Sequence, residues 1–392
     1  MAGSAAQLRL TKREIGPHEV VFGSIWLGPG SGTEKGNGNH PDLGQRNAND
    51  AIEAAALAGI VEFDTAPWYG AGAAEERLGG ALRVLHEKHP NISVKVTTKV
   101  GRLFMEPVSE GSVNDEVNGP SYKPALAGFD NPDRPPLFSR ICKNDYTAKG
   151  SRESHAHSLN RMGLAKVHGL RIHDPNDNSN NNRKSTSSSS FVDEVSIATD
   201  VKDGSCQHLR RMRDDTGEID HVGIGMNCTE EDHMGSPSDF LRLLRESPAN
   251  TFDSALMAGG WNLLNQTGLD CIKECQNRGI SVHIAGVFSS GYLVDESKPY
   301  AYVNSFSEQI VQRKNQWIRL ADEYQVSLPA LAIAFSALPA CVSRVVLGMA
   351  TADEVRQNLS WVEESNRVPV TLWVEAKNRG LISVDVPILE NI

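Results

Sequence analysis

Short runs of aliphatic and β-branched residues alternate along the chain with longer stretches in which apolar residues recur every three or four positions. The short runs are typical of buried strands, and the longer stretches are typical of amphipathic helices. Eight such runs occur, each followed by a helical or helix-bearing segment; they cover residues 19–27, 60–66, 92–100, 166–174, 221–227, 251–259, 280–288 and 343–349. Strands that alternate with helices pair in parallel, and eight units favour a closed α/β barrel, the (β/α)8 TIM barrel, over a doubly wound open sheet.

Two segments stand outside this alternation. Residues 101–144 are rich in Pro, Gly and Asn and are too long for an ordinary connection, so we predict a long loop over the barrel mouth. Residues 177–190 read "DNSNNNRKSTSSSS", a composition that buries too little apolar surface to offset the entropy lost on ordering. We predict that this insertion is disordered and that residues 1–392 form one barrel domain around both insertions.

The charge balance narrows the range of partners. Lys plus Arg number 39 and Asp plus Glu number 49, which gives a net charge of −10. Nucleic acids and anionic membranes bind clustered positive charge, so neither is an expected partner. No apolar run approaches the roughly eighteen residues that span a bilayer, and the first residues lack the layout of a secretory signal. We therefore expect a cytoplasmic protein.

The six cysteines are spread widely, and only Cys271 and Cys275 are close in sequence. Four residues apart on an expected helix, these two lie on one face, but no second pair or histidine follows at the spacing of a zinc site. We therefore predict reduced, structural thiols and no metal site.

Polar residues occur where several expected strands end. The second run ends at Asp64, and Tyr69 follows in the next loop. The third, fourth and fifth runs end with Lys99, His173 and Asn227. Each residue alone is more often structural, but the active sites of such barrels lie at the carboxyl ends of the strands. Because these strands are consecutive, we expect the side chains to converge on one mouth.

Four of these residues suit proton transfer. A free tyrosine has a pKa of about 10 and is a poor acid at neutral pH. We expect the ammonium group of Lys99 to lower the pKa of Tyr69, and Asp64 to hold that ammonium group charged and in place. His173 is then a candidate to donate a hydrogen bond to a substrate oxygen and fix its orientation.

Other motifs give weaker indications of function. "GPGSGT" at residues 28–33 lacks the third glycine and the following helix of a dinucleotide fingerprint, and no G-x-S-x-G serine elbow is present. Trp26, Trp68 and Trp261 lie near strand ends. They are candidates for substrate walls, since aromatic faces pack against the C–H faces of sugars, and core packing is the alternative.

The motifs "FDTAPWYGAGAAEERLGGAL", "TTKVGR" and "RIHD" resemble those of the aldo-keto reductase family, in order and at fitting spacing. The resemblance covers roughly residues 20–358 and, within the family, looks most like the aldose 1-dehydrogenase branch, which includes L-galactose, L-fucose and D-arabinose dehydrogenases and a pyridoxal dehydrogenase. It implies an oxidoreductase whose NAD(P) cofactor lies across the barrel mouth. It also implies a catalytic set of Asp64, Tyr69, Lys99 and His173.

The resemblance implies cofactor contacts as well. Asn227 matches the family's asparagine for the nicotinamide amide, and "GVFSSG" matches its diphosphate loop. The full set of matching positions is Ser24, Asn227, Gly286, Val287, Phe288, Ser289, Ser290, Gly291, Gly348, Glu354 and Asn358. Members that prefer NADP hold its 2′-phosphate with a lysine and an arginine, which here fall on Gly348 and Glu354. A carboxylate beside a phosphate is repulsive, so NAD is the expected cofactor and NADP the second option.

These observations predict an NAD(P)-dependent enzyme that oxidises an aldose at C1 to the aldonolactone, with Tyr69 as general acid/base. One alternative is an aldehyde or ketone reductase of the same family, with pyridoxal among the substrates. Another is a non-catalytic, cofactor-sensing subunit, because the family includes potassium-channel β subunits. A small-molecule sugar or carbonyl compound is the expected partner, and the chain is expected to be a monomer or small homo-oligomer.

Overall fold

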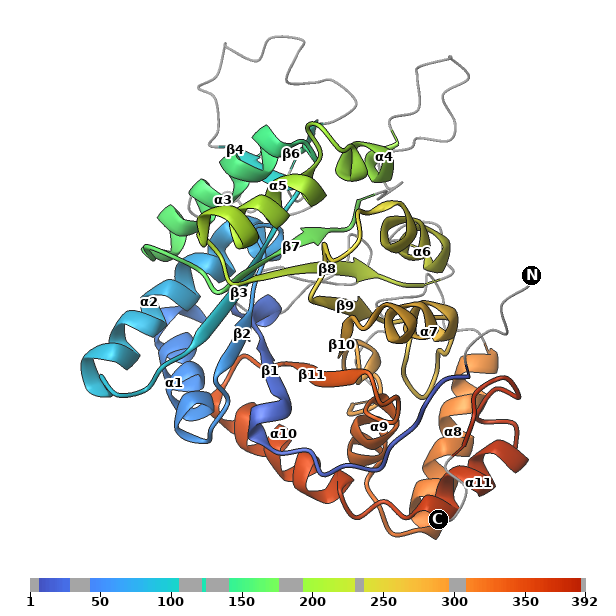
Figure 1. Ribbon diagram of the computed structural model, residues 1–392. Coiled ribbons are helices and arrows are strands. Elements are labelled where there is room, and N and C mark those ends of the chain that lie inside the picture. Colours follow the sequence, from blue (N-terminus) through green and yellow to red (C-terminus); the bar gives the residue numbers. More distant parts are fainter. Residues whose placement is uncertain are drawn as a thin grey trace, which may run out of the picture.

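The computed structural model describes residues 7–28, 43–105, 122–124, 141–175, 193–229, 236–295 and 308–388. Eight parallel strands close into a barrel in the order β1-β11-β10-β9-β8-β7-β3-β2 (Figure 1). Their bounds are β1 Val20–Gly23, β2 Glu62–Asp64, β3 Lys95–Val100, β7 Gly169–His173, β8 His221–Asn227, β9 Ser254–Ala258, β10 Ser281–Ala285 and β11 Val342–Gly348. The predicted (β/α)8 barrel is therefore confirmed, and the open-sheet alternative is excluded.

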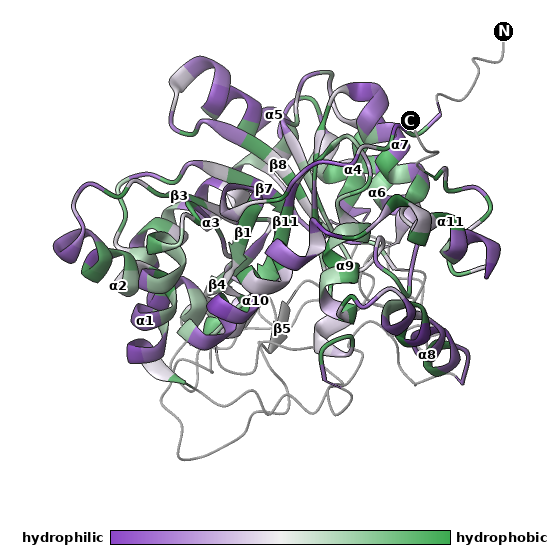
Figure 2. Cartoon of the chain, turned by 90° about the horizontal axis from the view of Figure 1, so that it is seen from below, coloured by the Kyte–Doolittle hydropathy of each residue, from purple (hydrophilic) through white to green (hydrophobic). Residues whose placement is uncertain are grey.

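The helices lie around the outside of the strands, with α1 and α2 at the left of Figure 1 and α8 and α11 at the lower right. They are α1 Gly44–Leu57, α2 Ala73–Lys88, α3 Ala148–Met162, α4 Glu194–Thr199, α5 Ser205–Arg211, α6 Pro237–Glu246, α7 Leu269–Arg278, α8 Glu308–Glu323, α9 Leu328–Ser336, α10 Ala352–Ser365 and α11 Val370–Asn378. Hydrophilic and hydrophobic residues alternate along outer helices such as α8 in Figure 2. That pattern is expected for helices that pack one face on a barrel.

Short helical turns follow several strands: η2 Ser24–Leu27 after β1, η3 Tyr69–Gly72 after β2 and η7 Ser289–Gly291 after β10. The first run expected as a strand, residues 19–27, is thus a four-residue strand followed by a 3₁₀ turn. Two further turns are η1 Pro17–Glu19 before β1 and a turn of π-helix, η6 Met212–Thr216, after α5. Tyr69 begins the turn that follows the carboxyl end of β2.

The segment 101–144 contains a small antiparallel sheet in the order β4-β6-β5. Its strands are β4 Arg102–Met105, β5 Tyr122–Pro124 and β6 Ile141–Asn144. They are too short for their periodicity to be recognised in the sequence. The predicted disorder of residues 177–190 lies outside the described residues, as do residues 106–121 and 125–140.

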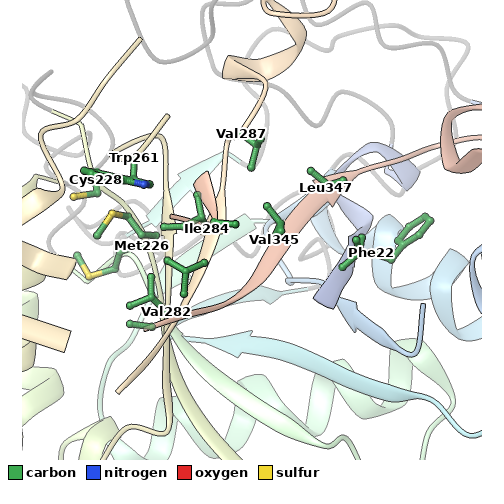
Figure 3. Packing of buried hydrophobic residues seen from close by; sticks show 14 of the residues in the cluster. Phe22, Met226, Cys228, Trp261, Val282, Ile284, Val287, Val345 and Leu347 are labelled. Carbon is green, nitrogen blue, oxygen red and sulfur yellow. The ribbon is translucent and has the colours of Figure 1, made fainter. Parts of the chain in front are cut away.

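The strands have two buried faces. The large core between strands and helices includes Phe22, Ile284 and Leu347, which Figure 3 shows packed side by side with their neighbours. A smaller cluster consists of Val21, Leu256 and Val346, which lie one position away from core residues on the same strands. Since side chains alternate across a strand, this small cluster lines the barrel interior. Polar residues share that interior.

Close packing of α2 on α3 depends on a helical glycine and gives a stability prediction. A β-carbon added at Gly79 would lie 2.0 Å from the carbonyl oxygen of Met162, which is backbone and cannot rotate away. We expect Gly79→Ala to lower the free energy of unfolding by about 1–3 kcal/mol, the usual cost of overpacking.

The next residue, Gly80, provides the matched control in the same helix. Its added β-carbon would lie 2.8 Å from the end of the Gln45 side chain, which can move. We expect Gly80→Ala to be neutral or to stabilise the helix by up to about 1 kcal/mol. Denaturant unfolding of both variants measures the difference, and equal stabilities would contradict the packing described for Gly79.

Candidate active site

The carboxyl ends of three barrel strands and the turn after β2 form the candidate site. Asp64 ends β2, Lys99 lies near the end of β3, and His173 ends β7, while Tyr69 begins η3. Asp64, Lys99 and His173 are buried, and Tyr69 is half-buried. The structure thus brings the four residues selected from the sequence to one end of the barrel.

Lys99 is at the centre of the hydrogen bonds in this set. Its Nζ donates to Asp64 Oδ1, to the Thr65 carbonyl oxygen at 2.8 Å and to the Tyr69 hydroxyl oxygen at 3.1 Å. The same Nζ lies 4.6 Å from the centroid of the Tyr69 ring. An ammonium group has three donors, and these three bonds use all of them. Lys99 is therefore fixed against the tyrosine in one orientation.

The pKa of Tyr69 differs from the sequence-based prediction. Burial, followed by the charges of Asp64 and Asp174, raises the pKa of Tyr69 well above its usual value, although Arg102 and Arg171 lower it. The prediction that the neighbouring lysine leaves the tyrosine with a lowered pKa was wrong. The phenol loses hydration, and the carboxylate that pairs with Lys99 opposes its effect. Tyr69 is a neutral hydrogen-bond donor at neutral pH.

His173 is a neutral imidazole beside the tyrosine. The two rings meet edge to face with centroids 6.0 Å apart. Burial, Arg102 and Lys99 lower the pKa of His173 well below its usual value. Its Nδ1 is buried and has no hydrogen-bond partner in the described part of the chain. An unpaired buried nitrogen beside a phenol is suited to bind an oxygen of a substrate.

Asp174 fixes the neighbouring strand ends and was missed from the sequence. It has a positive φ of 42°, a conformation that Asp tolerates better than most residues. Its carboxylate accepts from the Asn227 backbone N at 2.8 Å and from Asn227 Nδ2 at 3.2 Å. Arg102 Nη2 lies 3.1 Å from the same carboxylate, and the Tyr146 hydroxyl donates to the Asp174 carbonyl oxygen at 2.8 Å. The motif "RIHD" contains this residue, but its hydrogen-bond partners could not be predicted from the sequence.

The three tryptophans lie in different surroundings. The guanidinium carbon of Arg102 lies 4.7 Å from the Trp68 ring centroid, and Phe104 packs against the same ring at 5.8 Å. Trp26 faces the end of β11, since a β-carbon added at Gly348 would meet its Nε1 at 2.5 Å. Both lie near the candidate site.

Trp261 belongs to the core between strands and helices (Figure 3). It is completely buried and stacks on Phe335 with centroids 5.0 Å apart. Its position favours core packing, the alternative weighed for all three tryptophans.

The loop after β10 has the features of a diphosphate site. Gly286, Ser289, Ser290 and Gly291 all have positive φ, so the loop is coiled into a left-handed turn of the kind that presents backbone N–H groups to anions. The Ser289 hydroxyl is buried and, like that of Ser24 just after β1, finds no hydrogen-bond partner among the described residues. These orphaned donors fit a phosphate-bearing cofactor.

Two other residues of this loop anchor it. Val287 is buried in the core, and Phe288 packs edge to face against Trp361 with centroids 5.6 Å apart. Their side chains hold the loop in place, so in this position only their backbone is suited to face a phosphate.

The remaining predicted cofactor residues meet beyond β11. Asn358 Nδ2 donates to the Gly348 carbonyl oxygen at 3.4 Å, and Glu354 accepts from the Ala350 backbone N at 2.6 Å. Arg356, the nearby cation, pairs with Asp353. The structure therefore groups Gly348, Glu354 and Asn358 at one strand end and leaves a carboxylate there.

The aldo/keto reductase family model matches residues 30–366, which is most of the chain. This chain belongs to the aldo/keto reductase family. The resemblance to the family's aldose 1-dehydrogenase branch is likewise confirmed by its relatives. As a family member it is an oxidoreductase of small molecules, and its family binds nicotinamide cofactors.

Two relatives are similar to this chain over most of their length. A pyridoxal 4-dehydrogenase of Microbacterium luteolum is 28% identical over 377 residues, covering 95% of this chain and 98% of the relative. A D-threo-aldose 1-dehydrogenase of Pseudomonas sp is 28% identical over 337 residues, covering 84% and 87%.

Among solved structures, the glycerol dehydrogenase of Gluconobacter oxydans has a TM-score of 0.59 at 18% identity and covers 100% of this chain and 99% of its own. That likeness supports the fold of the reductase. In the described residues, no helix is both long and apolar enough to cross a membrane.

Proposed function

We propose that this aldo/keto reductase oxidises the cyclic hemiacetal form of an aldose at C1, yielding the aldonolactone. The observation that carries the proposal is the bonded set of Tyr69, Lys99 and Asp64 beside a neutral His173. The set supplies a proton-transfer group, a fixed cation and an uncharged donor within one mouth. L-Galactose, L-fucose and D-arabinose are the aldoses of first choice.

The chain's own residues divide the reaction between them. His173 binds the ring or hydroxyl oxygen of the substrate and orients C1. Tyr69, as the phenolate that Lys99 stabilises, takes the proton of the C1 hydroxyl group as the carbon–oxygen double bond forms, and it becomes a neutral phenol. A bound nicotinamide cofactor supplies the acceptor for the hydride that leaves C1. The products are a lactone, a reduced cofactor and one proton.

Pyridoxal is the second substrate candidate because it too forms a cyclic hemiacetal, whose oxidation gives a lactone. The relative that acts on pyridoxal is matched over nearly its full length. Production of reduced cofactor at neutral and alkaline pH, with a panel of aldoses and pyridoxal, tests the proposal. Turnover of an aldose supports the proposal. Turnover of pyridoxal alone would identify pyridoxal as the substrate in place of an aldose, and cofactor binding without any turnover favours a sensing subunit.

Carbonyl reduction is a second candidate function, favoured by the raised pKa of Tyr69. A neutral phenol is the form that donates a proton to a carbonyl oxygen, whereas oxidation needs the phenolate. We therefore infer that oxidation speeds up with rising pH and that reduction of an aldehyde or ketone is the faster direction at neutral pH. Rates in both directions at one pH compare the two candidates.

We also propose NAD as the preferred cofactor. Glu354 is exposed, and its bond to the Ala350 N–H holds its carboxylate at the end of β11. A carboxylate there repels a 2′-phosphate but accepts a hydrogen bond from a free 2′-hydroxyl. Arg356, the cation two positions further along, pairs with Asp353.

The corresponding prediction is that kcat/KM with NAD exceeds that with NADP by at least about tenfold, a difference of about 1.4 kcal/mol. Glu354→Arg should narrow or reverse the preference, and Glu354→Gln, which removes only the charge, should have a smaller effect in the same direction. Steady-state kinetics with both cofactors measures this. Equal or better use of NADP by the unmodified enzyme would show that Glu354 does not select the cofactor.

A further inference from the structure

A buried arginine lies beneath the candidate catalytic set. Arg171 is in β7, two residues before His173, and is only 2% exposed. Its Nε donates to Asp64 Oδ2 at 3.1 Å, Nη1 donates to Ser254 Oγ at 2.8 Å, and Nη2 lies 3.0 Å from His283 Nδ1. These partners belong to β2, β9 and β10, so the side chain crosses the barrel interior.

Two glycines of β8 make room for the cations. A β-carbon at Gly223 would lie 2.8 Å from Arg171 Nη1, and one at Gly225 would lie 3.0 Å from Lys99 Cε. The register pairs Lys99 with Arg171 and Arg171 with Gly223 across adjacent strands. The sequence "GIG" in this strand thus accommodates Lys99 and Arg171 side by side.

The charges of this cluster do not cancel. Asp64 accepts from Lys99 through Oδ1 and from Arg171 through Oδ2. Lys99 and Asp64 by themselves form a neutral pair, and the charge of Asp64 raises the pKa of Tyr69, against the effect of the ammonium group. The second cation leaves the cluster with one more positive than negative charge.

We propose that Arg171 is a positioning residue of the candidate site, which holds Asp64 from below and supplies the positive charge that the Lys99–Asp64 pair lacks. The proposal rests on the proposed function, because it concerns the proton transfer assigned to Tyr69. Burial of an arginine without such a role costs free energy of folding. A hydrophobic residue of similar volume would fill the barrel interior with equal or greater stability.

Several titratable or charged groups lie around Tyr69. Lys99 and Asp64 approach from β3 and β2, His173 and Asp174 from the end of β7, and Arg102 from β4; Arg171 lies below them. Asp64 and Asp174 raise the pKa of Tyr69, and Arg102 and Arg171 lower it. His283, next to Arg171, has a pKa well below its usual value because of burial and of Arg171 itself, so it stays neutral.

The test is the pH dependence of three variants. Oxidation needs the deprotonated tyrosine, and loss of a nearby cation raises the pKa of Tyr69. The rising limb of kcat/KM for oxidation should therefore move to higher pH by about one unit in Arg171→Met. The same shift is expected in Arg171→Gln, which also lacks the charge but, unlike methionine, still offers a hydrogen-bond donor. Arg171→Lys, which keeps the charge, should restore most of the original profile. The KM for substrate should change far less than kcat.

Arg344→Met is the matched control. Arg344 Nη2 lies 2.7 Å from Glu62 Oε1, so this variant also removes an arginine–carboxylate pair on β2, two residues from Asp64. We expect a loss of stability and an unmoved pH profile. A neutral Arg171 variant with the original profile, or equal profiles for Arg171→Gln and Arg171→Lys, would overturn the proposal.

A second arm separates this proposal from the proposed function. The same variants are assayed in the direction of reduction with benzaldehyde, where Tyr69 must be protonated and the falling limb should move upward by the same amount. Turnover of benzaldehyde but of no sugar or pyridoxal would refute the substrate and leave the test of Arg171 intact. Absence of turnover in both directions would overturn both proposals.

Discussion

Tyr69→Phe is expected to lower kcat by about 10²–10⁴-fold while the enzyme still binds its cofactor. The substitution removes the hydroxyl that accepts a hydrogen bond from Lys99 Nζ at 3.1 Å but keeps the ring that packs against His173. The proton of the substrate hydroxyl then has no positioned acceptor. Steady-state kinetics gives kcat, and quenching of protein fluorescence gives the dissociation constant of the cofactor.

Tyr324→Phe is the control for loss of a tyrosine hydroxyl. Tyr324 follows α8 and packs against the core, far along the chain from the strand ends of the site. Its variant should retain kcat within about twofold, because nothing that transfers a proton is altered. Near-normal turnover in Tyr69→Phe would remove this tyrosine from the mechanism.

Lys99→Met should be the second most damaging change, with kcat reduced by about 10²-fold or more and the rising limb of the oxidation profile moved to higher pH. The Tyr69 hydroxyl loses its charged donor, and the Thr65 carbonyl oxygen loses its partner. Arg171 still pairs with Asp64, so the carboxylate is not left buried alone and the fold should persist. Kinetics across pH, together with thermal unfolding, measures both effects.

Lys314→Met provides an internal comparison. Lys314 is 3% exposed, donates to the Tyr292 carbonyl oxygen at 2.7 Å and lies 4.1 Å from the centroid of the Tyr292 ring, much as Lys99 lies against Tyr69. Removing this ammonium group should reduce stability without moving the pH profile. A profile that shifts equally in both variants would mean that Lys99 acts only through the fold.

The barrel was predictable because its strands are buried on both faces and are therefore mostly apolar. Runs such as "VVFG" and "VSRVVLG" are buried between helices and barrel interior, so they stand out from the amphipathic helices that follow them. The sheet of β4, β5 and β6 was not predictable. Its strands are three or four residues long, within a segment rich in Pro, Gly and Asn.

The candidate site was predictable where a polar residue interrupts the end of an apolar run, as Asp64 and His173 do. Arg171 lies inside such a run and was overlooked. One signal could have found it: side chains alternate along a strand, so a residue two positions before His173 shares its face. Gly223 and Gly225 in the next strand have no side chains, and this leaves space for Arg171 and Lys99.

The direction of the pKa shift of Tyr69 could not be read from the sequence. It depends on how much water the phenol loses and on how two carboxylates and three cations are spaced around it. The sequence shows which charged residues are near one another along the chain, but their combined effect on the tyrosine depends on the three-dimensional arrangement. The same limit applied to Trp261, whose place in the core depends on its stacking with Phe335.

The most direct test of the central claim, oxidation at C1 by hydride transfer beside Tyr69, uses an aldose deuterated at C1. The unmodified enzyme is incubated with NAD and C1-deuterated L-galactose, L-fucose or D-arabinose, and the products are analysed by mass spectrometry. We expect deuterium in the reduced cofactor, the lactone as the sugar product and a slower rate than with the unlabelled sugar. Deuterium that stays in the sugar product, or a cofactor reduced without it, would contradict oxidation at C1.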